Sequence, residues 1–228
     1  MSIFCLIVLT KVYESFTHPL SYLLVCGTLS LPYLLYPFFT SSPYASKAIL
    51  YLTIYSFIGN YFYTHYFYTI LKAQYTFIGV RFNNVPIGMY FATVFYFTSY
   101  HAFSNCVLRF FDVSYEEGRM KKILFGCVVF TLSYFTAFME SFSISSFPYY
   151  NFSDRSMVYT LGSLFYGIYF LFSFPMFYYF DKDVDKKNGR RVTVWETVVE
   201  SCGCGMLILI GLDFVRVLVV KVPFVMEL

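Results

Sequence analysis

Long apolar runs separated by short polar connections dominate the chain. Five runs are each long enough to cross a membrane as a helix, and they cover residues 19–40, 48–71, 86–111, 123–147 and 156–180. A spanning helix needs about 20 mostly apolar residues, and a sixth run at residues 192–220 qualifies if its ends lie in the interfacial region. The pattern predicts an all-α, polytopic membrane helix bundle. We interpret residues 1–228 as a single integral membrane domain.

The start of the chain carries a shorter apolar run. Residues 1–10 are apolar but reach only about half the length of a spanning helix before Lys11. A signal peptide is the alternative, but the run lacks a basic leading segment and a clear cleavage site. We therefore expect a truncated N-terminal helix, whose upstream half is missing here, followed by six full transmembrane helices.

Proline positions mark helix starts and internal bends. Pro19, and Asn84 followed by Pro86, are typical of the first turn of a helix. Pro32, Pro37 and Pro175 lie inside apolar runs, where a kink is the usual consequence.

Composition and charge agree with a membrane protein. Hydrophobic residues make up 58% of the chain and charged residues 13%, against about 25% charged residues in soluble domains. If residues 1–10 count as the first helix, the connections after the second, fourth and sixth helices carry ten Lys and Arg, and the opposite side carries five. This excess predicts that the former connections face the cytosol. The basic residues are thus topology signals, and we expect no nucleic-acid partner.

Cysteine spacing offers no metal site. All six cysteines fall in apolar runs without the spacing of metal ligands or of a disulfide framework. We expect them to be small packing residues, and we expect no metal.

A few polar residues interrupt the apolar runs. The ionisable ones are His65, His101, Glu140, Asp213 and Arg216, and the uncharged ones include Asn60 and Asn105. Ionisable groups inside membrane helices are costly and usually mark a functional or partnered site.

Helix geometry sorts these residues by depth. At 1.5 Å per residue, His65 lies about 9 Å from the lumenal end of its run, and Glu140 and Asp213 lie about 10 Å from theirs. These three side chains are expected in one layer. His101 lies about 22 Å from the lumenal start of its run, which predicts a level nearer the cytosol.

Each polar residue also has a structural interpretation. Asp213 and Arg216 are three residues apart, as in an ion pair within one helix. His101 and Asn105 share a helix face and can be a hydrogen-bonded packing pair. Glu140 has no local partner in the sequence, which favours a functional role.

The chemistry of the layer is acid-base chemistry in apolar surroundings. A histidine and a glutamate can exchange a proton, and aromatic faces stabilise a nearby cation. The chain has 30 Phe and 24 Tyr, which either pack against neighbours and lipid or line a cavity for a large apolar ligand. This set of residues points to acid-base catalysis through a carbocation on an apolar substrate.

Several stretches resemble the cycloeucalenol cycloisomerase family. They are GNYFYTHYF from Gly59, YTF from Tyr75 and RFNNVP from Arg81, YHAFSN from Tyr100, SYFTAFMESFSISSFPYYNFSDRS from Ser133, and GSLFYGIYFLFSFPMF from Gly162. The similarity covers residues 10–220, and the motifs are long and irregular, so shared composition explains them poorly. The resembling proteins have more sequence before the position of Ile3.

The resemblance implies an activity and a location. It implies an isomerase that opens the 9,19-cyclopropane ring of a 4α-methyl sterol, converting cycloeucalenol to obtusifoliol without a cofactor. It also implies a multi-pass protein of the endoplasmic reticulum membrane. The expected partners are a cyclopropyl sterol and membrane lipid, and the oligomeric state is left open.

The resemblance and the polar layer together suggest site residues. We expect His65 as the acid with Glu140 as counter-ion or base, or the opposite assignment. His101 with Asn105 is expected to bind the sterol hydroxyl or to complete a proton relay. Residues expected to contact the sterol are Asn60, Tyr61, Tyr100, Asn105, Tyr134 and Tyr166.

Two other functions remain open from the residues alone. A sterol isomerase that shifts a ring double bond also passes through a carbocation, so the same buried groups would serve it. A non-enzymatic sterol-binding or transport protein would need the cavity but no proton-transfer pair.

Overall fold

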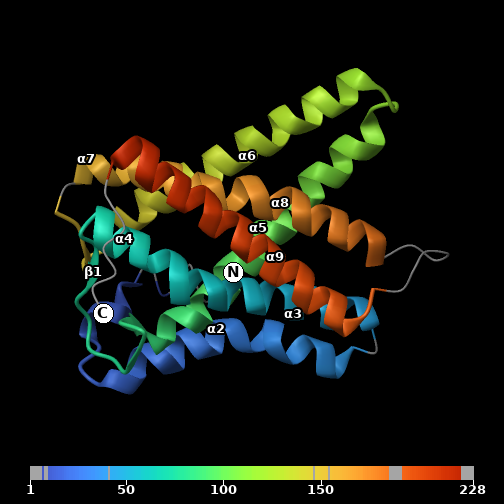
Figure 1. Ribbon diagram of the computed structural model, residues 1–228. Helices are drawn as coiled ribbons and strands as arrows, with labels where there is room; N and C mark the ends of the chain where they lie inside the picture. Colours follow the sequence, from blue (N-terminus) through green and yellow to red (C-terminus); the bar gives the residue numbers. More distant parts are fainter. Residues whose placement is uncertain are drawn as a thin grey trace.

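The computed structural model describes residues 7, 10–40, 42–145, 147–153, 155–184 and 192–221. Most of these residues are helical (Figure 1). The helices are α2 (Pro19–Phe39), α3 (Pro43–Ile58), α4 (Thr64–Ile70), α5 (Ile87–Ser114), α6 (Arg119–Ser145), α7 (Arg155–Met157), α8 (Ser163–Val184) and α9 (Val194–Val215). A short 3₁₀ turn, η1 (Val12–Ser15), precedes them. The expected helix at residues 1–10 lies outside the described residues, apart from Ile7 and Thr10.

Three π-helical turns continue neighbouring α-helices. They are η2 (Gly59–Tyr63) between α3 and α4, η3 (Val158–Gly162) between α7 and α8, and η4 (Arg216–Val220) after α9. The continuous helical segments thus run over residues 43–70, 155–184 and 194–220. π-turns inside helices are rare and frequently occur at functional sites.

Four very short strands form two antiparallel pairs. They are β1 (Gln74–Tyr75), β2 (Arg81–Phe82), β3 (Val85–Pro86) and β4 (Tyr150–Asn151), with β1 paired to β4 and β2 to β3. The turn between β2 and β3 holds Asn83 and Asn84 at positive φ, 50° and 60°, a conformation that asparagine tolerates well. The loops at this end of the bundle are therefore tied together by backbone hydrogen bonds.

Side-chain caps set several helix starts. His18 accepts the backbone N–H of Leu20 ahead of Pro19, which confirms the predicted start of this helix. At α9, Thr193 and Glu196 cap each other's backbone N–H, as in a capping box. Pro32 and Pro37 lie inside α2 without ending it, and Pro175 does the same in α8.

Four segments are long and apolar enough to cross a membrane by length and composition. They are Pro19–Phe39, Arg119–Ile144, Val158–Lys182 and Val194–Leu218, and they indicate a multi-pass membrane protein. The two other predicted runs also form long helices, over residues 43–70 and in α5, but these are less apolar. The number of spanning helices, expected as six and a truncated one, stays a prediction.

Helix packing buries an aromatic core. The main contacts join α6 to α8, α2 to α5 and α3 to α9. The end of α5 and the start of α6 leave the rest of the bundle together (Figure 1). The largest fully buried side chains include Tyr51, Tyr55, Tyr63, Phe165, Phe170 and Phe174. Large apolar side chains such as Phe38, Phe39 and Val113 are more than 80% exposed, as a lipid-facing surface requires.

Candidate functional site

Glu140 carries a buried carboxyl oxygen with no hydrogen-bond partner in the described part of the chain. This oxygen is Oε2, in the C-terminal half of α6. The nearest polar group is the hydroxyl of Tyr100, which faces the carboxyl from α5. An unpaired carboxyl oxygen in apolar surroundings costs free energy. Glu140 is therefore the strongest candidate for a group whose partner is a ligand.

Further tyrosines surround this carboxyl. Tyr96 of α5, Tyr75 of β1 and Tyr166 of α8 interact electrostatically with Glu140, and Tyr55 of α3 does so as well. We call these four and Tyr100 the tyrosine cage. Four elements distant in sequence supply it, so the packing of α3, α5, α6 and α8 creates it. Hydroxyls around a carboxyl can follow its change of charge by donating or accepting hydrogen bonds.

His65 does not pair with Glu140. It lies on α4, directly after the π-turn η2, and its Nε2 atom is buried without a partner in the described residues. Its ring lies 5.5 Å from the ring of Tyr68, and Tyr68 lies 6.3 Å from Tyr75 of the cage. Among the described residues, His65 and Glu140 form no hydrogen bond with each other, and the ring contacts of His65 lead through Tyr68 to Tyr75.

His101 is fully buried and uses both ring nitrogens. Its Nδ1 lies 2.7 Å from the carbonyl oxygen of Phe97, and its Nε2 lies 3.0 Å from the hydroxyl of Ser173 on α8. Since the carbonyl can only accept, Nδ1 carries a proton. His101 and Glu140 lie closer in depth than helix counting predicts, because Tyr100, the residue before His101, faces Glu140.

Asn105 contributes to a buried carboxylate cluster that the sequence analysis missed. The carboxylate of Asp181 on α8 is 2% exposed and accepts hydrogen bonds from Asn105 Nδ2 at 2.7 Å and from Arg109 at 2.5 Å. The Tyr44 hydroxyl of α3 also donates to it. Asp181 lies one residue past the apolar run at 156–180, so the pattern of runs assigns it to a connection. Asn105 and Arg109, four residues apart on one face of α5, were the signal that a partner lay opposite.

A second charged cluster lies nearby, close to the C-terminal end of α5. Asp112 lies 2.8 Å from Lys121 Nζ and 2.6 Å from Lys182 Nζ. These two ammonium groups hold the pKa of the Asp112 carboxyl below its usual range. The cluster joins α5, α6 and α8 beyond the run at 86–111.

The comparison with known proteins shows what these residues belong to. The chain is 39% identical to the cycloeucalenol cycloisomerase of Arabidopsis thaliana over 219 residues, which cover 90% of this chain and 76% of that protein. The chain belongs to the cycloeucalenol cycloisomerase family. As a member of that family it is an isomerase. No family model matches the chain. No solved structure matches it either.

The stretches that resemble the cycloeucalenol cycloisomerases meet around the cage. Residues 59–67 hold the π-turn η2 and His65, and residues 133–156 hold Glu140. Residues 100–105 and 162–177 supply Tyr100, His101, Tyr166 and Ser173.

The described contacts of three expected sterol-binding residues do not involve Glu140. Asn60 is buried and donates to the carbonyl of Ser56 on its own helix. Tyr61 stacks on Phe57 at 5.9 Å, and its carbonyl accepts from Asn83. Tyr134 is 57% exposed on the outer face of α6. Of the expected contacts, Tyr100 and Tyr166 join the cage.

Asp213 forms the predicted ion pair with Arg216. Both Arg216 Nε, at 3.0 Å, and a terminal guanidinium nitrogen, at 2.5 Å, donate to one Asp213 oxygen. Tyr66 of α4 interacts with Asp213 as well. Asp213 is thus held in an ion pair, and the shared layer with His65 and Glu140 stays a prediction.

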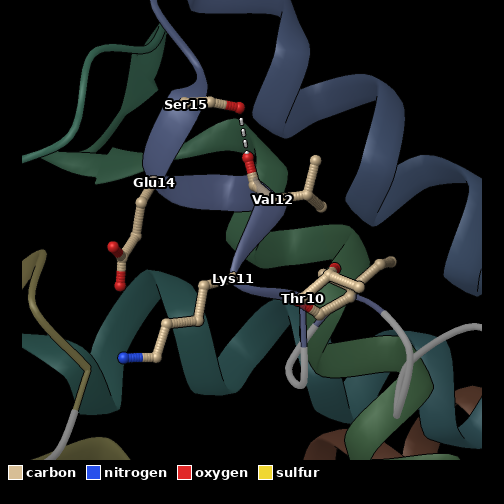
Figure 2. Close-up of a pocket in the computed structure, with 6 residues that line it drawn as sticks. Thr10, Lys11, Val12, Glu14 and Ser15 are labelled. Atoms are coloured by element: carbon tan, nitrogen blue, oxygen red, sulfur yellow. Dashed lines mark hydrogen bonds between the residues drawn. The ribbon is translucent and has the colours of Figure 1, made fainter.

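A surface depression lies near the N-terminal end of the described chain (Figure 2). Ile7, Thr10, Lys11, Val12, Glu14 and Ser15 line it. Ser15 donates to the carbonyl of Val12 across it at 2.7 Å, and none of the expected site residues takes part. Across the described ranges, no group of three His, Cys, Asp or Glu side chains is arranged to hold a metal.

Proposed function

We propose that this chain opens the 9,19-cyclopropane ring of a 4α-methyl sterol in the endoplasmic reticulum membrane, converting cycloeucalenol to obtusifoliol. The observation that carries the proposal is the buried, partnerless carboxyl oxygen of Glu140 inside the tyrosine cage. The name of the Arabidopsis relative supplies the substrate class.

The reaction needs one proton donor and one acceptor. A proton adds to the ring methylene, carbon 19, and the electrons of the bond between carbons 9 and 19 form the new C–H bond. A tertiary cation remains at carbon 9. Loss of the proton on carbon 8 then supplies the electrons of a double bond between carbons 8 and 9, so no redox change occurs.

We assign the donor role to Glu140. In its protonated form the free carboxyl oxygen offers the proton, and the Tyr100 hydroxyl is placed to donate a hydrogen bond to the carboxylate that remains. The sequence alone favoured His65 as donor. In the structure His65 contacts the ring of Tyr68 and has no described hydrogen bond to the carboxyl, which supports the opposite assignment.

The cage contributes through electrostatics and exclusion of water. A tenfold gain in rate needs about 1.4 kcal/mol, and one desolvated cation–π contact supplies about 2 kcal/mol. One ring therefore gives little more than tenfold, whereas several rings and the carboxylate act together. A dry site also keeps water from trapping the cation.

The test is sterol profiling in cells that lack this activity. We expect the wild-type chain to produce obtusifoliol from supplied cycloeucalenol. Glu140→Gln keeps the shape but removes the acid, so turnover should fall by about a hundredfold or more. Glu117→Gln is the control, because that carboxylate is 81% exposed and should have no effect.

Other outcomes identify the competing functions. A product with a moved double bond and an intact cyclopropane would identify a double-bond isomerase. Sterol binding without any product would identify a binding or transport protein. Folded Glu140→Gln protein with full turnover would remove Glu140 from the mechanism.

A further inference from the structure

We propose that Tyr55, Ser173 and His101 form the proton acceptor that opposes Glu140. This inference rests on the proposed function and names the group that takes the proton from carbon 8. The three side chains come from α3, α8 and α5 and are fully buried.

The hydrogen bonds of His101 give this set a direction. Nδ1–H donates to the Phe97 carbonyl, so the lone pair of neutral His101 lies on Nε2 and points to Ser173. The Ser173 hydroxyl therefore donates to Nε2. Its oxygen keeps lone pairs that can accept a hydrogen bond from a further hydroxyl.

Tyr55 is in place to be that further hydroxyl. Its oxygen lies beside Ser173 but forms no hydrogen bond with the described residues. Its ring lies 5.3 Å from the His101 ring. Tyr55 also interacts with Glu140 across the cage. It is thus the member of the set that has a described interaction with the proposed acid.

The transfer balances without any added reagent. The Tyr55 oxygen takes the proton of carbon 8 as its own proton moves to Ser173, and the Ser173 proton moves to His101 Nε2. An imidazolium forms, and the return of one proton to Glu140 by the same route resets both groups. Phe174, Phe177 and Phe97 lie 5.2 Å, 5.3 Å and 6.4 Å from the His101 ring and help to stabilise the imidazolium.

His65 is the alternative acceptor. Its Nε2 is also unpartnered among the described residues, and its ring contacts Tyr68. Tyr55, by contrast, interacts with Glu140 itself. The two assignments predict different variants in which the cation forms but the proton on carbon 8 is retained. These are variants of Ser173 and Tyr55 for the relay, and a variant of His65 for the alternative.

The experiment separates formation of the cation from loss of the second proton. Purified protein in lipid is incubated with cycloeucalenol in heavy water. Deuterium in the ring methylene of recovered substrate reports reversible protonation by Glu140, and obtusifoliol reports completion. Ser173→Ala should lower product formation by about tenfold or more while deuterium still enters the substrate. Ser173→Thr keeps the hydroxyl and should restore product formation.

Two further variants keep the proposal testable if Ser173→Ala fails to fold. Tyr55→Phe keeps the ring and should give the same exchange without product. Ser201→Ala is the matched control, because this buried serine also makes one bond between helices, to the carbonyl of Tyr51, and it should change neither signal.

Several results would overturn the relay. Wild-type product formation by both Ser173→Ala and Tyr55→Phe would do so, as would an equal fall of exchange and product, which indicates a structural role. Exchange without product in His65→Asn would assign the acceptor to His65. Loss of both signals in Glu140→Gln concerns only the acid of the proposed function. It leaves the assignment of the acceptor to Tyr55, Ser173 and His101 intact.

Discussion

Glu140 shows how much one residue can reveal before its neighbours are known. A carboxylate inside an apolar run, with no partner three or four positions away, was expected to be functional, and the structure leaves one of its oxygens unpaired within the described chain. Its neighbours were not predictable. Tyr100 and Tyr166 were chosen with Tyr134, but only the first two face Glu140. The orientation of a helix face depends on where the next helix packs, which a pattern of apolar residues does not fix.

Tyr100 offers a direct test of the cage. Tyr100→Phe keeps the ring and removes the hydroxyl that faces Glu140. A hydrogen bond to a charged group contributes about 1.5–3 kcal/mol, so turnover should fall by about tenfold or more.

Tyr134→Phe is the matched control for this substitution. The same hydroxyl is removed from a residue that is 57% exposed, and turnover measured in the same membranes should stay unchanged. Equal rates for Tyr100→Phe and Tyr134→Phe would show that the hydroxyl at Tyr100 plays no part.

Contacts between elements carried the information that the sequence lacked. The ion pair of Asp213 and Arg216 was predicted because both residues lie on one helix, three positions apart. Asp181 was missed because its partners Tyr44, Asn105 and Arg109 come from two other helices. Counting residues from helix ends also placed Glu140 and the neighbourhood of Tyr100 at different depths. The count assumes parallel helices that begin in one plane, whereas the packing of α5 on α6 brings Tyr100 and Glu140 together.

Asp181 should matter for stability more than for chemistry. Asp181→Asn leaves the Arg109 guanidinium without its carboxylate, and breaking a buried pair costs about 3–5 kcal/mol. The Arg109 side chain is 44% exposed, so solvent screens it and the loss falls near or below the low end of that range. We expect the thermal midpoint in lipid to fall by several degrees, at about 2–4 °C for each kcal/mol.

An exposed carboxylate provides the comparison for Asp181. Glu117 pairs with Lys121 at 2.8 Å but is 81% exposed, so Glu117→Gln should leave the midpoint within about one degree. A drop in Glu117→Gln as large as that in Asp181→Asn would show that burial of the Asp181 cluster contributes nothing.

At the scale of the whole molecule, the apolar runs predicted the helices well. Every full run between residues 19 and 220 coincides with a helical segment. The thickness of the bilayer and the rise per residue of a helix together set the length of such a run. The same argument does not prove that each helix crosses the bilayer. α5 is the critical case, because polar residues such as Tyr100, His101 and Asn105 make it less apolar than the four clear spans.

The topology of α5 can be decided by labelling from one side of the membrane. Only α5 separates the connection that holds Gln74 from the connection that holds Glu117. The excess of Lys and Arg predicts that Glu117 lies in the cytosol and Gln74 on the lumenal side. In sealed vesicles with the cytosolic face outward, an impermeant maleimide should label Glu117→Cys at once and Gln74→Cys only after permeabilisation. Wild-type protein controls for its own cysteines. If both variants were labelled without permeabilisation, α5 would not cross the membrane, and Tyr100 and His101 could not lie at the depth that a dry carbocation site demands.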